Sequence, residues 1–370
     1  MRAYQLPKGG AGIDALTQVE RPVPKPLYRQ VPVKVGACSL NYRDLGIVRG
    51  TYRMPVRDHL VPLSDGAGEV VEAGPGVVRV KAGDKVAGCF FQRWPGGDLG
   101  PRVHASALGG SIDGMLAEYV VLEEEGVVPI PAHLSIEEAA ALPCAAVTAW
   151  NAMMHHARLN AGQSVLLQGT GGVSIFGLQL AHAMGVTAII TSSSDEKLAR
   201  AKSLGAACGI NYKSTPEWDK AAVEFTGGSG VDHVVEVGGA ETLTRSFGAI
   251  RLGGKISMIG GLSGGATELN PGLIFSKRAN VQGIYVGSTQ MFEAERCHRR
   301  QRAQAGDRSR VRFRRGAGGL AAHGSGRAFR QDRHPCRVSG AAIRIVAIET
   351  ALVPGPSSSG RSPGFPLARE

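Results

Sequence analysis

Apolar positions along the chain follow two different patterns. The first pattern, of short β-rich runs, occupies the front part of the sequence. From residue 4 to about residue 128, short β-rich runs are broken by Gly and Pro. Such runs predict a compact antiparallel barrel. We expect its main strands at residues 31–35, 68–72, 85–90 and 115–122.

The second pattern begins at Ser164, where short apolar runs start to alternate with amphipathic helical stretches. This alternation predicts an α/β fold with a doubly wound parallel sheet, the Rossmann arrangement, covered by helices on both faces. Between the two parts, Ser135 precedes Glu137 and Glu138 and predicts a helix N-terminus. The expected strands are 165–167, 188–191, 209–211, 231–237 and 255–259, and the expected helices are 173–184, 195–204, 217–225 and 240–250.

We therefore predict a front domain at residues 1–127, a nucleotide-type domain at 128–294 and an aberrant tail at 295–370. The tail differs sharply in composition from the rest of the chain. Residues 1–294 hold 26 Lys and Arg against 26 Asp and Glu, whereas the tail holds 16 Arg, no Lys and 5 acidic residues, so it carries the whole net charge of +11. Such a tail is typical of a nucleic-acid-binding arm or of a solvated disordered segment.

The rest of the composition indicates a soluble, unexported protein. The sequence has no run of about 18 apolar residues and no N-terminal apolar segment with a cleavage site. Six cysteines stand far apart, without the paired spacing of a disulfide framework or a zinc knuckle. We expect reduced thiols, a cytoplasmic location and no membrane partner. The cysteines lie at positions 38, 89, 144, 208, 297 and 336.

A glycine-rich turn follows the first strand of the nucleotide-type domain and opens a helix. Glycine permits the tight turn and lets backbone amides approach a pyrophosphate at the helix N-terminus. The turn alone is weak support, but the strand before it and the strand–helix units after it make dinucleotide binding the preferred interpretation. The candidate cofactor-binding residues of the turn are Gly169, Gly171, Gly172 and Val173, and Ser174 replaces the third glycine of the usual pattern.

The tip of the second strand carries Ser192 where NAD-preferring proteins place an acidic residue on the ribose. Without that acid, Ser192, Ser193, Lys197 and Tyr212 can receive a 2′-phosphate, which carries nearly two negative charges. We therefore expect NADPH as the cofactor, with NADH still possible. The alternative is that the serines at 192–194 only cap a helix.

Several motifs occur in order, and together they are specific. They are Asn41-Tyr42-Arg43-Asp44, the segments at 66–72 and 82–86, the segment at 142–150 and the glycine turn. Over about residues 1–294 the chain resembles the medium-chain dehydrogenase/reductase superfamily, and within it the zinc-independent quinone-oxidoreductase-like branch. The resemblance implies a GroES-like front domain, a nicotinamide and substrate cleft beside the Rossmann domain, and a homodimer if the C-terminus is in frame. It also places Thr148, Gly238 and Gly260 near the nicotinamide.

The chain departs from the zinc-bearing relatives at their ligand positions. Asn41 stands where they carry Cys, and Ser64 and Asp65 stand where they carry His and Glu, which leaves Cys144 alone. A catalytic zinc needs about three protein ligands. We therefore expect no metal site and no zinc, with Cys144 as a small core residue.

Without zinc to polarise a carbonyl, hydride transfer needs an acceptor that delocalises the resulting charge. A quinone or an α,β-unsaturated carbonyl is such a small-molecule substrate, and hydrogen bonds or one general acid can stabilise it. By resemblance the candidate catalytic residues are Asn41 and Tyr52, with Tyr42 and Arg43 alongside, although Tyr52 can also be a packed aromatic. The alternatives are an alcohol dehydrogenase acting without metal, and a non-catalytic nucleotide- or RNA-binding protein of the same fold.

The resemblance ends near residue 294, and the genetic code offers an explanation for the tail. Codons for residues 303–315, read one nucleotide later, can spell LKPVIDRVFGFDE, and codons within 324–338 can spell AAAGHFGKIVIRV. Both are typical family endings in the expected order. We interpret residues from about 295 onward as out-of-frame translation, so the basic tail indicates no nucleic-acid partner.

This interpretation makes a direct prediction about the gene. A single-nucleotide shift near codon 295 should restore both endings, and the restored protein should be more soluble because the closing strands then cover the sheet edges of the front domain. Sequencing the source gene tests this prediction. Codons that do not spell these endings would refute it and return the basic arm to consideration.

Overall fold

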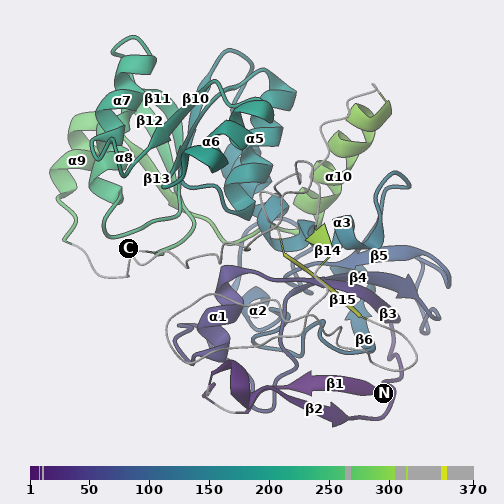
Figure 1. The fold of residues 1–370 in the computed structure, drawn as a ribbon. Helices are drawn as coiled ribbons and strands as arrows, with labels where there is room; N and C mark the ends of the chain where they lie inside the picture. Colours follow the sequence, from purple (N-terminus) through teal and green to yellow (C-terminus); the bar gives the residue numbers. More distant parts are fainter. Residues whose placement is uncertain (8, 11, 263–267, 305–313, 316–342, 348–370) are drawn as a thin grey trace, which may run out of the picture. The chain divides into compact units, whose positions relative to one another are not determined.

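The computed structural model describes residues 1–7, 9–10, 12–262, 268–304, 314–315 and 343–347, which fold into two compact units (Figure 1). The front unit comprises residues 1–144, 288–300 and the described residues after 311. The Rossmann unit comprises residues 145–287. The front unit thus extends beyond residue 127, where the sequence analysis placed the domain boundary.

A mostly antiparallel sheet is the framework of the front unit. Its central strand β3 (Gln30–Ser39) pairs with β4 (Asp65–Val70) and β6 (Tyr119–Glu123), and the sheet continues through β5 (Lys85–Gly88) to β7 (Val127–Pro129). The four predicted strands are confirmed, with bounds that differ by a few residues. The smaller elements are the ribbon β1 (Arg2–Gln5) and β2 (Thr17–Glu20), the helices α1 (Tyr42–Val48), α2 (Pro101–His104) and α3 (Ile136–Ala140), the short helices η1 (Ile13–Ala15), η2 (Glu124–Gly126) and η3 (Leu142–Ala146), and α10 (Thr289–Gln304).

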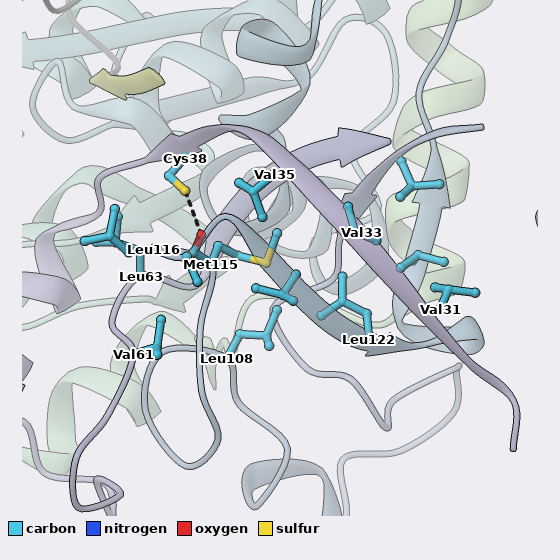
Figure 2. Packing of buried hydrophobic residues seen from close by; sticks show 14 of the residues in the cluster. Val31, Val33, Val35, Cys38, Val61, Leu63, Leu108, Met115, Leu116 and Leu122 are labelled. Carbon is cyan, nitrogen blue, oxygen red and sulfur yellow. Dashed lines mark hydrogen bonds between the residues drawn. The ribbon is translucent and has the colours of Figure 1, made fainter. Parts of the chain in front are cut away.

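Alternate residues of β3 supply the core of the front unit. Val31, Val33 and Val35 are buried together with Met115 and Leu122 (Figure 2), as the period of two in a strand requires. Figure 2 also shows the Cys38 thiol, which donates a hydrogen bond of 3.1 Å to the carbonyl oxygen of Met115. Ser135 accepts a hydrogen bond from the backbone N–H of Glu138, which confirms the predicted helix start.

A short segment of the tail, which was interpreted above as out-of-frame translation, joins the sheet of the front unit. Strand β15 (Arg344–Ala347) pairs in parallel with β3 and in antiparallel orientation with β14 (Arg314–Arg315). Val346 is 2% exposed, and Ile343 and Ile345 pack against the front core. A short apolar run is enough to satisfy the free edge of β3. Residues 295–304 of the tail lie in α10, and the tail residues other than these, 314–315 and 343–347 lie outside the described residues.

The Rossmann unit contains six parallel strands in the order β10-β9-β8-β11-β12-β13. This order confirms the predicted doubly wound sheet. Five strands were predicted from the sequence, whereas the edge strand β13 was not. The strands are β8 (Ser164–Leu167), β9 (Thr187–Ser192), β10 (Cys208–Asn211), β11 (Val231–Glu236), β12 (Ile250–Met258) and β13 (Asn280–Gly283).

Helices cover both faces of this sheet, with α5 and α6 on one side and α7, α8 and α9 on the other (Figure 1). Trp218 of α7 and Phe247 of α8 are buried against Val234 of β11. None of the helices in the described part of the chain is long and apolar enough to cross a membrane. The helices are α4 (Val147–Trp150), η4 (Asn151–His156), α5 (Gly172–Met184), α6 (Asp195–Ser203), α7 (Trp218–Phe225), α8 (Leu243–Ala249) and α9 (Pro271–Lys277).

Candidate active site

A buried ion pair marks the start of α1 in the front unit. The Asp44 carboxylate accepts a hydrogen bond of 2.8 Å from the backbone N–H of Asn41 and lies 3.4 Å from Nη1 of Arg43. Burial raises the pKa of Asp44, and the charge of Arg43 opposes that rise. Burial also opposes the charge of Arg43, yet Asp44 and Tyr52 raise the pKa of the guanidinium. The structure thus keeps a cation inside the front unit.

Aromatic rings and a glycine fix the position of this cation. The Arg43 guanidinium lies 4.6 Å from the ring centroid of Phe90 and 5.0 Å from that of Tyr52. Such cation–π contacts favour a desolvated guanidinium. A Cβ atom at Gly110 would lie only 2.7 Å from Nη2 of Arg43, so a larger residue there would displace the side chain. Arg43 also donates a hydrogen bond of 3.2 Å to the carbonyl oxygen of Leu108.

A second buried carboxyl group, that of Asp65, lies at the start of β4. It accepts hydrogen bonds from the Ser64 hydroxyl (2.7 Å) and from the backbone N–H of Cys144 (2.8 Å). Burial raises the pKa of Asp65 to about 7, and these hydrogen bonds, together with the nearby side-chain amide of Asn41, oppose the rise. Cys144 itself is partly exposed, which does not match its interpretation as a core residue.

Three buried donor atoms at this position have no hydrogen-bond partner among the described residues. They are Nδ2 of Asn41 and the Nε and Nη2 atoms of Arg43. An unsatisfied buried donor is costly, so such groups in a native fold call for an explanation. A ligand oxygen would satisfy them. The structure places the Arg43 guanidinium beside Tyr52, with Asn41 at the start of the same helix, whereas Tyr42 is 60% exposed.

The glycine turn of the Rossmann unit has the geometry that a pyrophosphate requires. Gly169 has a φ of +68°, which favours glycine, and a Cβ atom at Gly169 or Gly171 would meet nothing within 4 Å. Packing within the protein therefore gives no reason for glycine at 171, whereas close approach of a phosphate does. The turn leads into α5, whose N-terminus favours an anion. Gly172 and Val173 lie in the first turn of this helix.

The end of β9 provides the residues expected at the ribose. Ser192 is 2% exposed, and its hydroxyl is held inside the turn, where it accepts a hydrogen bond from the backbone N–H of Ser194 (3.3 Å). Ser194 caps α6 through the backbone N–H of Lys197. Ser192 is therefore less available to a ligand than the sequence suggested. Ser193 and Lys197 are partly exposed at this edge, and Tyr212, which follows β10, is 36% exposed.

The three residues expected near the nicotinamide lie in different parts of the Rossmann unit. Gly238 follows β11 and Gly260 follows β12, so both lie at the carboxyl edge of the sheet with the glycine turn. Thr148 is buried in α4. In the described residues no group of three His, Cys, Asp or Glu side chains has the arrangement of a metal site.

Several residues that complete these sites were not predicted from the sequence. In the front unit they are Asp44, Phe90 and Gly110, and in the Rossmann unit they are Gln168, Thr191 and Glu236. Glu236 gave a signal, since it is a charged residue that ends a strand directly after two buried valines. Thr191 accepts a hydrogen bond of 3.0 Å from the backbone N–H of Gly169, so the second strand supports the glycine turn.

A front barrel and a doubly wound sheet with this turn define a two-unit dehydrogenase fold, and comparisons with known proteins agree. Residues 28–132 match the family described as alcohol dehydrogenase GroES-like domain, and residues 172–297 match the family described as zinc-binding dehydrogenase. A zinc-type alcohol dehydrogenase-like protein of Schizosaccharomyces pombe is 45% identical over 289 residues, which cover 76% of this chain and 84% of the relative.

Two further comparisons extend this result. A quinone oxidoreductase of Rattus norvegicus is 30% identical over 290 residues, covering 78% of this chain and 81% of the relative. The crystal structure of Escherichia coli quinone oxidoreductase in complex with NADPH shares the fold, with a TM-score of 0.71 and 23% identity over 83% of this chain and 89% of that chain. The chain belongs to the medium-chain dehydrogenase/reductase superfamily and is an oxidoreductase.

The contact between Gly110 and Arg43 yields a prediction. Gly110→Ala should displace the guanidinium and lower turnover about tenfold or more, as loss of one positioned donor does in other enzymes. The unfolding free energy should fall by no more than about 1 to 3 kcal/mol, since overpacking is local. Steady-state kinetics and urea unfolding measure both quantities. Gly100→Ala is the control, because a Cβ atom there meets nothing within 4 Å; equal turnover in both variants would contradict the role given to Arg43.

Proposed function

We propose that the protein is a zinc-independent, NADPH-dependent reductase of quinones or α,β-unsaturated carbonyls. The bound nicotinamide would supply the hydride. The carbonyl oxygen of the substrate receives the displaced electron pair and accepts hydrogen bonds from Arg43 and Asn41. A proton from Tyr52 or from water then completes the reduction, so two electrons and two hydrogens are added to the substrate.

The unsatisfied donors of Arg43 and Asn41 are the observation that carries this proposal. Nε and Nη2 of Arg43 and Nδ2 of Asn41 are buried without a partner among the described residues. Donors that are fixed before the reaction stabilise developing negative charge without reorganisation. A guanidinium beside a single carboxylate retains capacity for one more anionic oxygen.

The zinc independence rests on residue chemistry. Of the three positions that hold zinc in metal-bearing relatives, Asn41 and Ser64 do not offer the usual ligands, and the Ser64 hydroxyl donates to Asp65. The family description that matches residues 172–297 includes zinc binding, but that segment contains none of these three positions. Arg43 would thus provide the positive charge that a metal provides elsewhere.

The cofactor preference rests on the edge of the sheet near β9. Ser192 ends β9, and Ser193, Lys197 and Tyr212 lie at the same edge. The first acidic residue after β9, Asp195, accepts a hydrogen bond of 2.8 Å from the side chain of Asn211. The open space above Gly169 and Gly171 fits a pyrophosphate. The related Escherichia coli enzyme was solved with NADPH, which supports the same assignment here.

An alcohol dehydrogenase remains the second candidate, because the Schizosaccharomyces pombe relative carries that name. The two candidates differ in the acceptor. An isolated aldehyde concentrates charge on one oxygen after hydride attack, whereas a quinone or an enone delocalises it. We also propose a small-molecule substrate and, for a protein with its C-terminus in frame, a homodimer.

A substrate panel tests the proposal. NADPH oxidation should be fastest with a quinone or an enone and should continue in the presence of a chelator. Elemental analysis of the purified protein should find less than about one zinc per ten chains. Arg43→Lys should lower turnover about a hundredfold. Stoichiometric zinc, or turnover with aldehydes alone, would overturn the assignment in favour of the alcohol dehydrogenase.

The nucleotide preference is tested separately. NADPH should bind more tightly than NADH, and Lys197→Ala should narrow the difference about tenfold because it removes a charged phosphate partner. Titration of each nucleotide gives the dissociation constants. Lys202→Ala removes the same charge from the last turn of α6 and should leave the ratio unchanged. Equal affinities in the unmutated protein would contradict the preference.

A further inference from the structure

The carboxylate of Glu236 lies at the end of β11, is fully buried, and accepts five hydrogen bonds. Oε1 accepts from the backbone N–H groups of Gly238 (2.8 Å) and Gly239 (2.9 Å) and from the Thr242 hydroxyl (2.6 Å). Oε2 accepts from Nε2 of Gln168 (2.7 Å) and from the Ser246 hydroxyl. All five donors are neutral groups. The carboxylate therefore organises the whole segment that follows β11.

Gln168 gives this network a fixed direction. Its Oε1 atom accepts hydrogen bonds from the backbone N–H groups of Val237 (3.1 Å) and Gly238 (3.2 Å). Backbone N–H groups can only donate, so the side-chain amide cannot turn around. Its Nε2 atom must then face Glu236 and the Ser246 hydroxyl (2.9 Å). A carboxamide facing a carboxylate is the one arrangement that satisfies every atom.

The pair connects two loops at the place where ligands bind in such sheets. Gln168 directly follows β8 and Glu236 ends β11, and these neighbouring strands are where the strand order reverses. Ligands of doubly wound sheets bind outside the carboxyl ends of the strands at this switch point. Gln168 leads into the glycine turn, and its carbonyl oxygen accepts a hydrogen bond of 2.6 Å from Ser174 in α5. The segment 237–242 forms the other side.

We propose that Glu236 and Gln168 are positioning residues that hold the glycine turn and the segment 237–242 in the geometry that binds the nicotinamide cofactor. Neither side chain contacts the cofactor in this proposal, and both act through backbone groups. The proposal rests on the proposed cofactor function and extends it to two residues that the motif does not include.

Exchanging the two side-chain groups tests the pair. Glu236→Gln places an amide N–H₂ against that of Gln168, and Gln168→Glu places two carboxylates in contact. Each single variant should bind NADPH about ten- to a hundredfold more weakly. The double variant E236Q/Q168E again pairs one carboxylate with one carboxamide, and every backbone N–H keeps an acceptor. Its dissociation constant should return to within about threefold of the unmutated value.

Asp232→Asn is the matched control for general destabilisation. Asp232 lies on the same strand at its opposite end, where its carboxylate accepts from Ser164 and pairs with Arg251. This variant should lower the melting temperature without changing the dissociation constant for NADPH. A loss of affinity in Asp232→Asn equal to that of Glu236→Gln would overturn the proposal, as would a double variant that binds as weakly as the single ones.

Amide hydrogen exchange without nucleotide separates this proposal from the proposed function. The amides of Val237, Gly238 and Gly239 should exchange faster in both single variants of the pair and at the unmutated rate in the double variant. If they do so while the unmutated protein binds neither NADPH nor NADH, the cofactor function and the positioning role both fail, although the network itself is correct. If binding is normal but exchange does not recover in the double variant, the positioning role alone is overturned.

Discussion

The ion pair between Arg43 and Asp44 allows a guanidinium to remain inside the front unit, where loss of water opposes any charge. Phe90 and Tyr52 replace part of the lost hydration with their ring faces. The position of α1 depends on the same carboxylate, since Asp44 also accepts the backbone N–H of Asn41 at the start of the helix. The Asp44 carboxylate therefore fixes the start of α1 and also stabilises the charge of Arg43.

The buried polar groups of the two units differ in how completely they are hydrogen-bonded. This difference distinguishes groups suited to binding a substrate from groups suited to holding the backbone in place. In the front unit, Arg43 and Asn41 keep donors without partners in the described structure. In the Rossmann unit, Glu236 receives five donors and leaves no capacity for another group. A group with unused hydrogen-bond donors can bind a substrate whose charge changes during the reaction. A group whose hydrogen bonds are all made instead holds its surroundings rigid.

Periodicity in the sequence predicted most of the fold, because strands and helices that bury one face repeat their apolar residues regularly. The edge strand β13 (Asn280–Gly283) was not predicted because it is short and contains few apolar residues. Strand β15 was not expected, because residues from about 295 onward were interpreted as out-of-frame translation, yet Val346 and its neighbours are buried beside β3. A few suitable apolar residues are enough to pair with a strand edge.

The candidate sites were predicted only where a motif is continuous in the chain. Asn41 and Arg43 lie in one motif, but Phe90 and Gly110 approach Arg43 from distant segments, which a single sequence does not reveal. Ser192 was assigned to the ribose because of its position at the end of the second strand, and its hydroxyl also accepts the backbone N–H of Ser194 within the turn. Contacts between distant segments and competition for hydrogen bonds are decided by the folded structure.

The close approach of Gly110 to Arg43 also matters for any attempt to move this arrangement into another protein. In its present position the guanidinium leaves no room for a Cβ atom at residue 110, so a side chain there would shift the end of Arg43. Transplanting Arg43 into another member of the superfamily should therefore reproduce its position only if the glycine is transplanted with it.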